Sequence, residues 1–321
     1  MNAQQWQGTP GFYEVWYLTL TDPASGTGLW IRYTMLAPTA GEEPTCSLWF
    51  LAMPPGEPPV ARKASWPIDR LRATSAPFSL SVDDARLTED GATGAFEDVA
   101  WDLRWSPRSR GISMVHPAVS RLAKTRFTVP LVDLAIDGEV SFAGRTLPIA
   151  AARGGQAHLW GTKHASRWAW VHCNDLREDG AFLEAVSVHV PRFGREIGPN
   201  TPVWAHLDGH DLDATGPLSL ARAESRFALT GWTFSARRGR RKLVVEVDAP
   251  RESLAGVTYH DPDGELAYCY NTEVATARLH LYDHRLGFPQ WTLRRSWHAE
   301  GRAHFEYAQR EPLPDVPLLT P

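Results

Sequence analysis

The sequence predicts an all-β protein made of two antiparallel β-domains in tandem. Turn-forming residues recur roughly every 8 to 12 positions, a spacing typical of sandwiches and barrels, and no segment has the pattern of a long helix. The second half also repeats the order of the first: an aromatic strand, a turn with acidic residues and glycine, and an amphipathic strand. These observations predict two related β-barrel or sandwich domains, at residues 1–152 and 153–321.

Length and composition agree with this division. The chain of 321 residues suffices for two domains of about 150 residues each. Hydrophobic residues make up 43% of it and charged residues 22%, which predicts a packed core rather than disorder. With 33 basic and 37 acidic residues the net charge is −4, so no nucleic-acid partner is expected.

The same sequence predicts a cytoplasmic protein with no integral membrane segment. Its first residues lack the basic and apolar regions of a signal peptide, and no apolar run approaches the roughly 20 residues that span a bilayer. The three cysteines, Cys46, Cys173 and Cys269, are far apart and odd in number, so we expect free, buried thiols. The oligomeric state is left open.

The first predicted element is a β-hairpin. Its strands lie at residues 13–20 and 29–36, which are rich in aromatic and β-branched residues, and the turn formers lie at residues 22–28. A third strand is predicted at residues 47–52 and is ended by prolines and a glycine at 54–56.

Further strands are predicted at residues 78–82 and 99–105. In the second of these, Asp102 and Arg104 lie on the face opposite the tryptophans. A solvated rim is the favoured interpretation of this polar pair, and a pair inside a barrel is the alternative.

Several short strands are predicted between residues 121 and 149, around turns at 137–138 and 143–144. Residues 151–155 then break the strand pattern with two glycines, and this break sets the predicted domain boundary.

The second half begins with a predicted strand at residues 168–175, a polar turn at 177–180 and a strand at 182–190, which echo residues 12–36. Further strands are predicted at residues 227–235, 243–247, 268–275, 277–282 and 303–309.

The most informative stretch, residues 158–175, lies at the middle of the chain. Period-two alternation places four of its side chains on one face of a strand: Trp168, Trp170, His172 and Asn174. Large aromatics that grade into hydrogen-bonding groups are expected of a pocket wall. The alternative is a core face, because most large aromatics on strands pack rather than bind.

Familiar chemical motifs are absent from the sequence. It contains no Gly-rich phosphate loop, no nucleophile elbow and no zincin helix. Histidines and acidic residues gather at 158–175 and 205–213, but neither spacing forces the convergent geometry of a metal site. We therefore expect no metal site. The basic run at residues 236–242 is expected to be a charged hairpin tip around Gly239, because a nucleic-acid site would need interleaved aromatics and a wider basic face.

Two carboxylates lie among aromatic residues. Glu14 shares a strand face with Trp16, and Glu273 shares one with Cys269 and Asn271. Burial against apolar rings would raise the pKa of such an acid and let it donate a proton near neutral pH. The alternative is an acid that is paired with an arginine, for instance Arg32 or Arg167, and serves structure alone.

The central motif of tocopherol cyclase and its bacterial relatives resembles two segments of this chain, Trp160-Gly161 and Arg167-Trp168-Ala-Trp170-Val-His172-Cys173-Asn174. The wider superfamily, which includes hydroxyneurosporene synthase (carotenoid 1,2-hydratase) and fungal Diels–Alderases, is similar at three more: His158-Leu-Trp160-Gly161, Tyr13-Glu14-Val-Trp16-Tyr17 and Leu29-Trp-Ile-Arg32-Tyr33. The likeness covers most of the chain and is strongest at residues 1–36, 99–105 and 121–176.

This resemblance implies two tandem lipocalin-like β-barrel domains, in agreement with the repeat. It also implies a pocket enzyme without an organic cofactor, acting on an apolar isoprenoid or polyketide-type molecule by cyclisation, hydration or pericyclic ring closure. His158 and Trp160 match the superfamily motif, whereas Glu14 and Glu273 as acids are inferred from this chain alone.

The leading hypothesis is a cofactor-independent cyclase, hydratase or isomerase. Its proton donor is expected among Glu273, Glu14, Asp175 and His158. The residues expected to bind substrate are Trp16, Tyr33, Trp160, Arg167, Trp168, Trp170, His172, Asn174, Tyr270 and Asn271. The alternatives are a lipocalin-type carrier or sensor of an apolar ligand, which needs the same pocket and no acid of shifted pKa, and a scaffold with a filled barrel.

Overall fold

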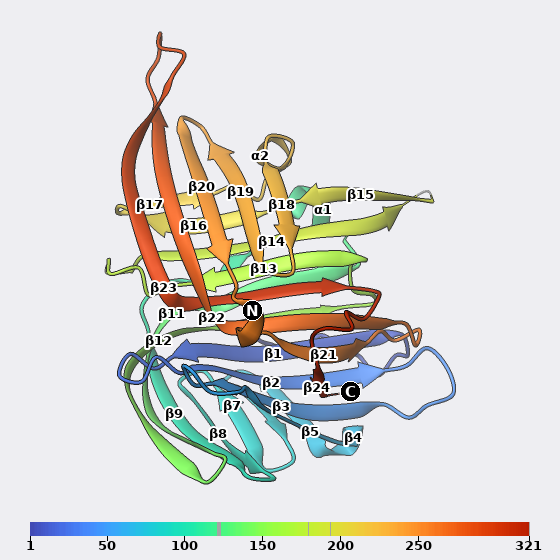
Figure 1. Ribbon diagram of the computed structural model, residues 1–321. Coiled ribbons are helices and arrows are strands. Elements are labelled where there is room, and N and C mark those ends of the chain that lie inside the picture. Colours follow the sequence, from blue (N-terminus) through green and yellow to red (C-terminus); the bar gives the residue numbers. More distant parts are fainter. Residues whose placement is uncertain (121–122, 179, 193, 321) are drawn as a thin grey trace.

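The computed structural model describes residues 1–120, 123–178, 180–192 and 194–320. It confirms the all-β prediction: two large curled antiparallel sheets are stacked on each other (Figure 1). Helical structure in the described residues is limited to α1 (Pro117–Ser120), α2 (Pro217–Leu220) and the 3-10 turns η1 (Ile68–Arg70) and η2 (Arg251–Ser253). None of the described helices has the length and hydropathy needed to cross a membrane.

The first sheet contains the first twelve strands. These are β1 (Phe12–Thr21), β2 (Gly28–Ala37), β3 (Thr45–Met53), β4 (Val60–Pro67), β5 (Leu71–Ser75), β6 (Phe78–Val82), β7 (Ala85–Thr88), β8 (Gly91–Phe96), β9 (Val99–Pro107), β10 (Ile112–Ser113), β11 (Thr125–Phe142) and β12 (Arg145–Gly161). The strand order is β4-β3-β2-β1-β12-β11-β9-β8-β7-β6-β5, and β10 pairs with β11.

The second sheet contains the other twelve. These are β13 (Arg167–Cys173), β14 (Phe182–Arg192), β15 (Arg195–Asn200), β16 (Val203–Leu207), β17 (His210–Asp213), β18 (Glu224–Ala228), β19 (Gly231–Arg238), β20 (Arg241–Asp248), β21 (Ala255–His260), β22 (Leu266–His284), β23 (Trp291–Gln309) and β24 (Leu318–Thr320). The strand order is β17-β16-β14-β13-β23-β22-β20-β19-β18, with β15 on β14 and β21 on β22. The short β24 pairs with β21 in parallel.

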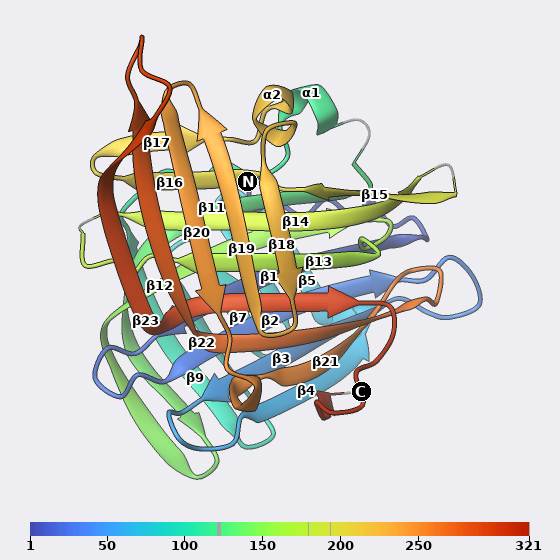
Figure 2. The same cartoon turned by 45° about the horizontal axis from the view of Figure 1, so that its top comes forward.

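Successive side chains of a strand point to opposite faces of its sheet, and the two faces belong to different buried layers. In β1, Trp16 and Leu18 pack inside the first sheet, while Val15 and Tyr17 point toward the second. Between the sheets lies a third buried cluster, made of outward-facing residues from both, which we call the interface layer. Both views show β1 and β2 running beside β22 along this junction (Figures 1 and 2).

Two predicted strand breaks are wrong, because the residues that suggested them form bulges. Residues 137–138 lie inside β11, where the register shifts and Gly138 has φ 141°. Residues 151–155 lie inside β12, where Ala151 has φ 52° and its N–H donates to the Asp137 carboxylate at 2.9 Å. Glycine and aspartate mark bulges as well as turns, and a bulge bends a strand without ending it.

Two further strand predictions have the wrong bounds. The strands predicted at residues 268–275 and 277–282 are one strand, β22, which bends at register shifts between Thr272 and Ala277. The strand predicted at residues 227–235 is instead divided between β18 and β19 by a tight turn. The remaining predicted strands are confirmed within one to three residues at most ends, and Asp102 and Arg104 are exposed, as expected of a solvated rim. Residues 121–122 and 179 of the predicted segments lie outside the described residues.

The chain leaves the first sheet after Gly161 and enters the second at Arg167. The predicted division at residue 152 would cut β12 in two. We propose residues 162–166 as the boundary between the two structural units.

Candidate functional site

The interface layer holds a buried polar cluster among aromatic rings. Its fully buried acids, Glu184 and Glu273, come from β14 and β22, and its fully buried histidines, His172 and His304, come from β13 and β23. All four side chains point from the second sheet toward the first, because they occupy the strand positions that alternate with that sheet's own core.

Glu273 and His304 form the closest pair in this cluster. Glu273 Oε2 lies 2.5 Å from His304 Nδ1, and each side chain is 1% exposed. Burial, and then the charge of Glu306, raises the pKa of Glu273 well above its ordinary value. Burial, and then the charge of His172, lowers the pKa of His304 well below its ordinary value. Both shifts favour the uncharged forms of the pair, a carboxylic acid and a neutral imidazole.

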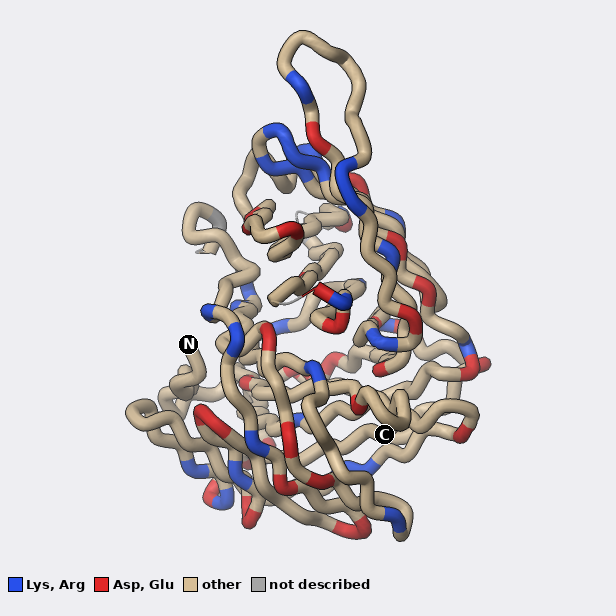
Figure 3. Tube along the Cα trace, turned by 90° about the vertical axis from the view of Figure 1, so that its left-hand side faces the viewer, with Lys and Arg blue, Asp and Glu red and all other residues tan. Residues whose placement is uncertain are grey.

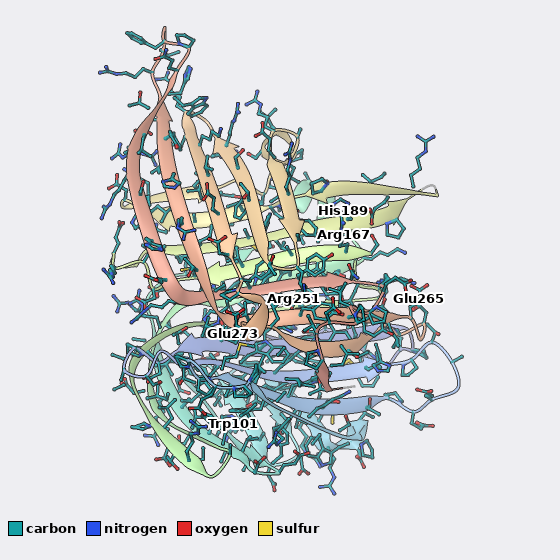
Figure 4. All side chains as sticks on the ribbon, in the orientation of Figure 1. Trp101, Arg167, His189, Arg251, Glu265 and Glu273 are labelled. Atoms are coloured by element: carbon teal, nitrogen blue, oxygen red, sulfur yellow. The ribbon has the colours of Figure 1, made fainter. Side chains whose placement is uncertain are left out.

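The first sheet approaches Glu273 closely. The Glu273 backbone N–H donates to Met53 Sδ at 3.0 Å, and a Cβ on Gly28 would lie 2.3 Å from the Glu273 carbonyl oxygen. Gly28 therefore permits a backbone approach that no other residue type would allow. Figure 4 shows Glu273 at this junction between the two sheets.

A second acid–imidazole pair lies beside the first. His172 Nδ1 is 2.8 Å from Glu184 Oε2, Trp170 Nε1 donates to Glu184 Oε1 at 2.5 Å, and burial raises the pKa of Glu184. The His172 and His304 rings are 5.9 Å apart. His172 Nε2 is buried without a hydrogen-bond partner in the described part of the chain, facing Gly155, where a Cβ would lie 2.9 Å away.

Aromatic rings from both sheets surround these pairs. Tyr17 meets Trp170 edge-on at 5.5 Å, and Trp168 stacks on Tyr259 at 6.4 Å. Burial, and then the charges of Glu184 and Glu306, raises the pKa of Tyr17 well above its ordinary value. The layer therefore combines apolar walls with several proton-carrying groups.

A cation and a third acid complete the cluster. The Arg32 guanidinium lies 3.9 Å from the ring centre of Tyr259 and is 5% exposed; its Nε and Nη1 have no hydrogen-bond partner in the described residues. Glu306 is half-buried and accepts hydrogen bonds from Trp168 Nε1 and from the Tyr259 hydroxyl. Within the described ranges, no group of three or more His, Cys, Asp and Glu side chains is placed to hold a metal ion.

A cavity of about 470 Å³ opens at the edge of the interface layer. Residues after β3 meet η2 and the C-terminal segment there, and the lining consists of Pro58, Pro59, Arg251, Glu252, Leu254, Asp315, Val316, Pro317 and Leu319. The next residue after Leu254 is Ala255, which pairs with Asn271 on β22, two residues before Glu273. Neither Glu273 nor His304 is among the residues that line this cavity.

The structure brings several of the predicted residues together. Trp168, Trp170, His172 and Glu273 share the interface layer, so the predicted wall faces the other sheet rather than the inside of a barrel. Asn271 lies beside them, with Nδ2 3.5 Å from Cys269 Sγ.

Asn174 lies at the end of the same wall. Its amide donates to the Gly154 carbonyl at 2.6 Å and to the buried Asp133 at 3.1 Å. Arg153 pairs with the same carboxylate at 3.0 Å. Asn174 is therefore bound to the first sheet in this structure.

Glu14 and His158 form a separate group inside the first sheet. Glu14 Oε1 lies 2.8 Å from His158 Nε2, and the Glu14 carboxylate also accepts the backbone N–H groups of Gln5 and Trp6. Trp16 stacks on the His158 ring at 4.8 Å, and Trp160 lies 4.6 Å from the same ring. This group fastens the N-terminal segment to β1 and β12.

The other predicted residues lie elsewhere. Tyr33 is inside the first sheet, where it accepts a hydrogen bond from Trp101, and Tyr270 is in the core of the second sheet. Asp175 pairs with Arg302 at 2.5 Å. Arg167 stacks on Phe227 and approaches His189, away from Glu273 (Figure 4). Glu14 and Glu273 thus pair with histidines and not with Arg32 or Arg167.

Sequence reasoning missed the partners of the two buried acids. His304 lies on β23 in alternation with Ala303 and Phe305, and Glu184 lies on β14 in alternation with Leu183 and Ala185. A polar residue on every second position of a strand whose other face is apolar was the available signal, but the same pattern is typical of a solvated face.

Comparison with known proteins places the chain in a family. No protein-family model matches it. The uncharacterized protein MT0513 of Mycobacterium tuberculosis (strain CDC 1551 / Oshkosh) is 32% identical over 304 residues, which cover 92% of this chain and 88% of that protein. The uncharacterized protein Rv0493c of strain ATCC 25618 / H37Rv gives the same identity and coverage.

Three solved structures share the fold. The AttH-type protein NE1406 of Nitrosomonas europaea has a TM-score of 0.58 at 12% identity and covers 96% of this chain and 98% of its own. CghA with Sch210972 has a TM-score of 0.58 at 9% identity, with coverage of 96% and 94%. Kievitone hydratase from Nectria haematococca has a TM-score of 0.55 at 9% identity, with coverage of 92% and 88%.

These structures show that the chain shares their fold, in agreement with the predicted all-β architecture. The two mycobacterial sequences are more similar to this chain than the solved structures are, and their 32% identity over 92% of the chain shows a family. The chain belongs to the same family as the mycobacterial proteins MT0513 and Rv0493c.

Proposed function

We propose that the protein is an enzyme that acts on an apolar small molecule by acid-initiated cyclisation, hydration or isomerisation, with Glu273 as the proton donor. One observation carries this proposal: a fully buried carboxyl group lies 2.5 Å from a fully buried imidazole, between two sheets that face each other with aromatic rings. A carboxylic acid that keeps its proton at neutral pH is suited to general acid catalysis.

The proposed reaction begins and ends with a protonated Glu273. The Glu273 O–H protonates an alkene or carbonyl of the substrate, which becomes a cation and leaves a carboxylate that the N–H of His304 stabilises. In a cyclisation or isomerisation, the cation then loses a proton to Glu273. In a hydration, water adds to the cation and the proton released from that water returns to Glu273. Either route restores the starting acid without a redox partner.

The surroundings suit a cationic intermediate. The faces of Trp168, Trp170 and Tyr259 attract positive charge, and the packed interface layer keeps bulk water away from a cation that cyclises or isomerises. The N–H groups of Arg32 that have no partner in the described residues supply donors for an oxygen at a polar end of the substrate.

The cavity at the edge of the interface layer supports an apolar substrate. Proline, leucine and valine side chains form most of its lining, and the lining residue Leu254 precedes Ala255, which pairs with Asn271 two residues before Glu273. The shared fold gives weaker support, since kievitone hydratase and the CghA that carries Sch210972 have it at 9% identity.

The test starts with native mass spectrometry of the protein purified from its own host, followed by identification of any released ligand. Turnover of that ligand and of a panel of isoprenoid quinols and polyenes is then compared for wild type, Glu273→Gln and the control Glu246→Gln, an exposed acid on β20. We expect Glu273→Gln to lose turnover and keep ligand affinity. Unchanged turnover would remove Glu273 from the mechanism, and binding without any turnover would identify a carrier.

A further inference from the structure

Two hairpins of the second sheet end side by side at the far end of the molecule. Strands β19 and β20 turn at Gly239, and β22 and β23 turn at residues 285–290. The His284 N–H donates to the Arg240 carbonyl at 2.9 Å, so the two turns are joined by a backbone hydrogen bond. Figures 1 and 2 show the β22–β23 hairpin projecting beyond the rest of the sheet. We call residues 237–242 and 284–293 together the hairpin tip.

The hairpin tip exposes large apolar side chains. Leu286 is 70% exposed, Phe288 is 60% exposed and Leu293 is 51% exposed, and these are three of the seven exposed large hydrophobic residues in the described ranges. Trp291, in the same hairpin, lies 5.1 Å from the ring of His284. Apolar residues gathered on one projecting turn are expected to contact another surface.

The tip is also strongly basic. Residues 237–242 include five basic side chains in six positions, and Arg285 adds another on the projecting turn. Figure 3 shows the Lys and Arg positions gathered at the base of the projecting hairpin. The acids nearby already have cationic partners: Asp283 pairs with Arg241 and Arg294, and Asp211 pairs with Arg110 and His206.

A cavity of about 470 Å³ lies between the two turns. Its lining consists of Arg238, Arg240, Arg241, Asp283 and His284 from the two hairpins, with Asp211 and Leu212 from β17. No ion pair of Arg238 or Arg240 is found among the residues that the structure describes. The guanidinium groups of these two residues are therefore available to an oxyanion, and the planar fork of arginine fits phosphate oxygens well.

We propose that the hairpin tip binds the surface of a membrane that contains anionic phospholipids. Leu286 and Phe288 enter the boundary between headgroups and acyl chains, Trp291 lies at headgroup level, and the arginine-lined cavity holds a lipid phosphate. Membrane-surface attachment requires two signals, and the tip combines apolar insertion with positive charge. The proposal concerns a surface far from Glu273 and does not depend on the proposed function.

The test is co-sedimentation of the full chain with vesicles of pure phosphatidylcholine, and with vesicles in which phosphatidylglycerol replaces a third of that lipid. We expect binding to the anionic vesicles, weakened by high salt. Arg238→Gln combined with Arg240→Gln should reduce the affinity about 25-fold, or about fivefold for each arginine. Leu286→Ala combined with Phe288→Ala should reduce it by about tenfold or more.

Matched controls come from other surfaces. Arg72→Gln changes an exposed arginine on β5, and Ile197→Ala shortens a 43% exposed side chain on β15. Both should bind vesicles as wild type does, and all variants should keep the wild-type melting temperature. Absence of binding to anionic vesicles, or equal binding by tip and control variants, would overturn the proposal. Tight binding of free glycerol phosphate with no gain from vesicles would also overturn it, since it would leave Leu286 and Phe288 without a role.

Discussion

The carboxyl group of Glu273 and the imidazole of His304 are in direct contact, 2.5 Å apart, and neither reaches solvent. Both pKa shifts disfavour charge: burial favours the protonated form of the Glu273 carboxyl group and the neutral form of the His304 imidazole. A buried ion pair would have to offset the cost of desolvating two charges, whereas a neutral pair with one hydrogen bond avoids that cost.

The first prediction concerns the position of this proton. At pH 7 the infrared difference spectrum of wild type minus Glu273→Gln should contain the carbonyl band of a protonated carboxylic acid. The physical reason is the burial that raises the pKa of Glu273. A carboxylate band in its place would show that the pair is ionic and would remove the proposed proton donor.

The second prediction is a pH-dependent stability difference. Above its ordinary pKa of 4.5 Glu273 releases its proton in the unfolded chain but keeps it in the folded protein. Its contribution to stability is therefore complete below that value and is lost as pH rises toward the folded pKa. Glutamine has no proton to release, so the free energy of unfolding of Glu273→Gln relative to wild type should rise with pH by about 1.4 kcal/mol per unit.

Urea unfolding of both proteins across this pH range measures that slope. The exposed control Glu246→Gln should show no pH-dependent difference from wild type. A flat difference for Glu273→Gln would mean that the folded protein does not hold the proton.

The third prediction tests the close approach of the sheets. Gly28→Ala places a Cβ 2.3 Å from the carbonyl oxygen of Glu273, so the sheets must separate locally. We expect a loss of about 1–3 kcal/mol in denaturant unfolding, together with reduced turnover. Gly216→Ala is the control, because its Cβ would have its nearest contact at 3.7 Å. Equal stability of the two variants would contradict the described junction.

The fourth prediction separates Glu14 from the chemistry. Glu14→Gln disturbs a carboxylate that accepts two backbone N–H groups and contacts His158, so it should cost about 1–3 kcal/mol of stability. Turnover per folded molecule should be unchanged. Asp175→Asn breaks a partly exposed pair with Arg302 and should cost less than about 1 kcal/mol. Loss of turnover in folded Glu14→Gln would return Glu14 to the list of proton donors.

The fifth prediction concerns the thiols. Burial raises the pKa of Cys46 to about 11 and that of Cys173 to about 12, and it raises the pKa of Cys269 well above its ordinary value. All three are free and buried, so a thiol reagent at pH 8 should label none in the native protein and three in denaturant. Rapid labelling of Cys269 in the native state would show that the interface layer opens.

Local pattern was enough to predict most strands, because aromatic and β-branched runs between turn formers are decided by nearby residues. It failed where tertiary pairing overrides a breaker: the β11–β12 register shifts between the pairs Ile136–Ala152 and Gly138–Ile149, and both strands continue through this bulge. A bulge and a turn use the same residues, and only the partner strand distinguishes them.

Local pattern likewise predicted one wall of the candidate site but not the partners of its acids. The alternation in β13 indicated that Trp168, Trp170 and His172 share a face, and burial in the interface layer agrees with it. Whether this face of β13 meets the other sheet depends on how the two sheets pack, and the sequence of a single strand does not contain that information. The partnership of Glu273 with His304 spans 31 positions and depends on the bent register of β22 and β23, so residue pattern alone could not reveal it.

The geometry at the junction of Gly28 and Glu273 depends on how the two sheets are placed against each other. The side chains around Glu273 come from both sheets, so a small shift of one sheet against the other would alter the distances across the junction together. A substitution that shifts one sheet against the other would therefore change the surroundings of Glu273 and His304 even where these two residues are unchanged.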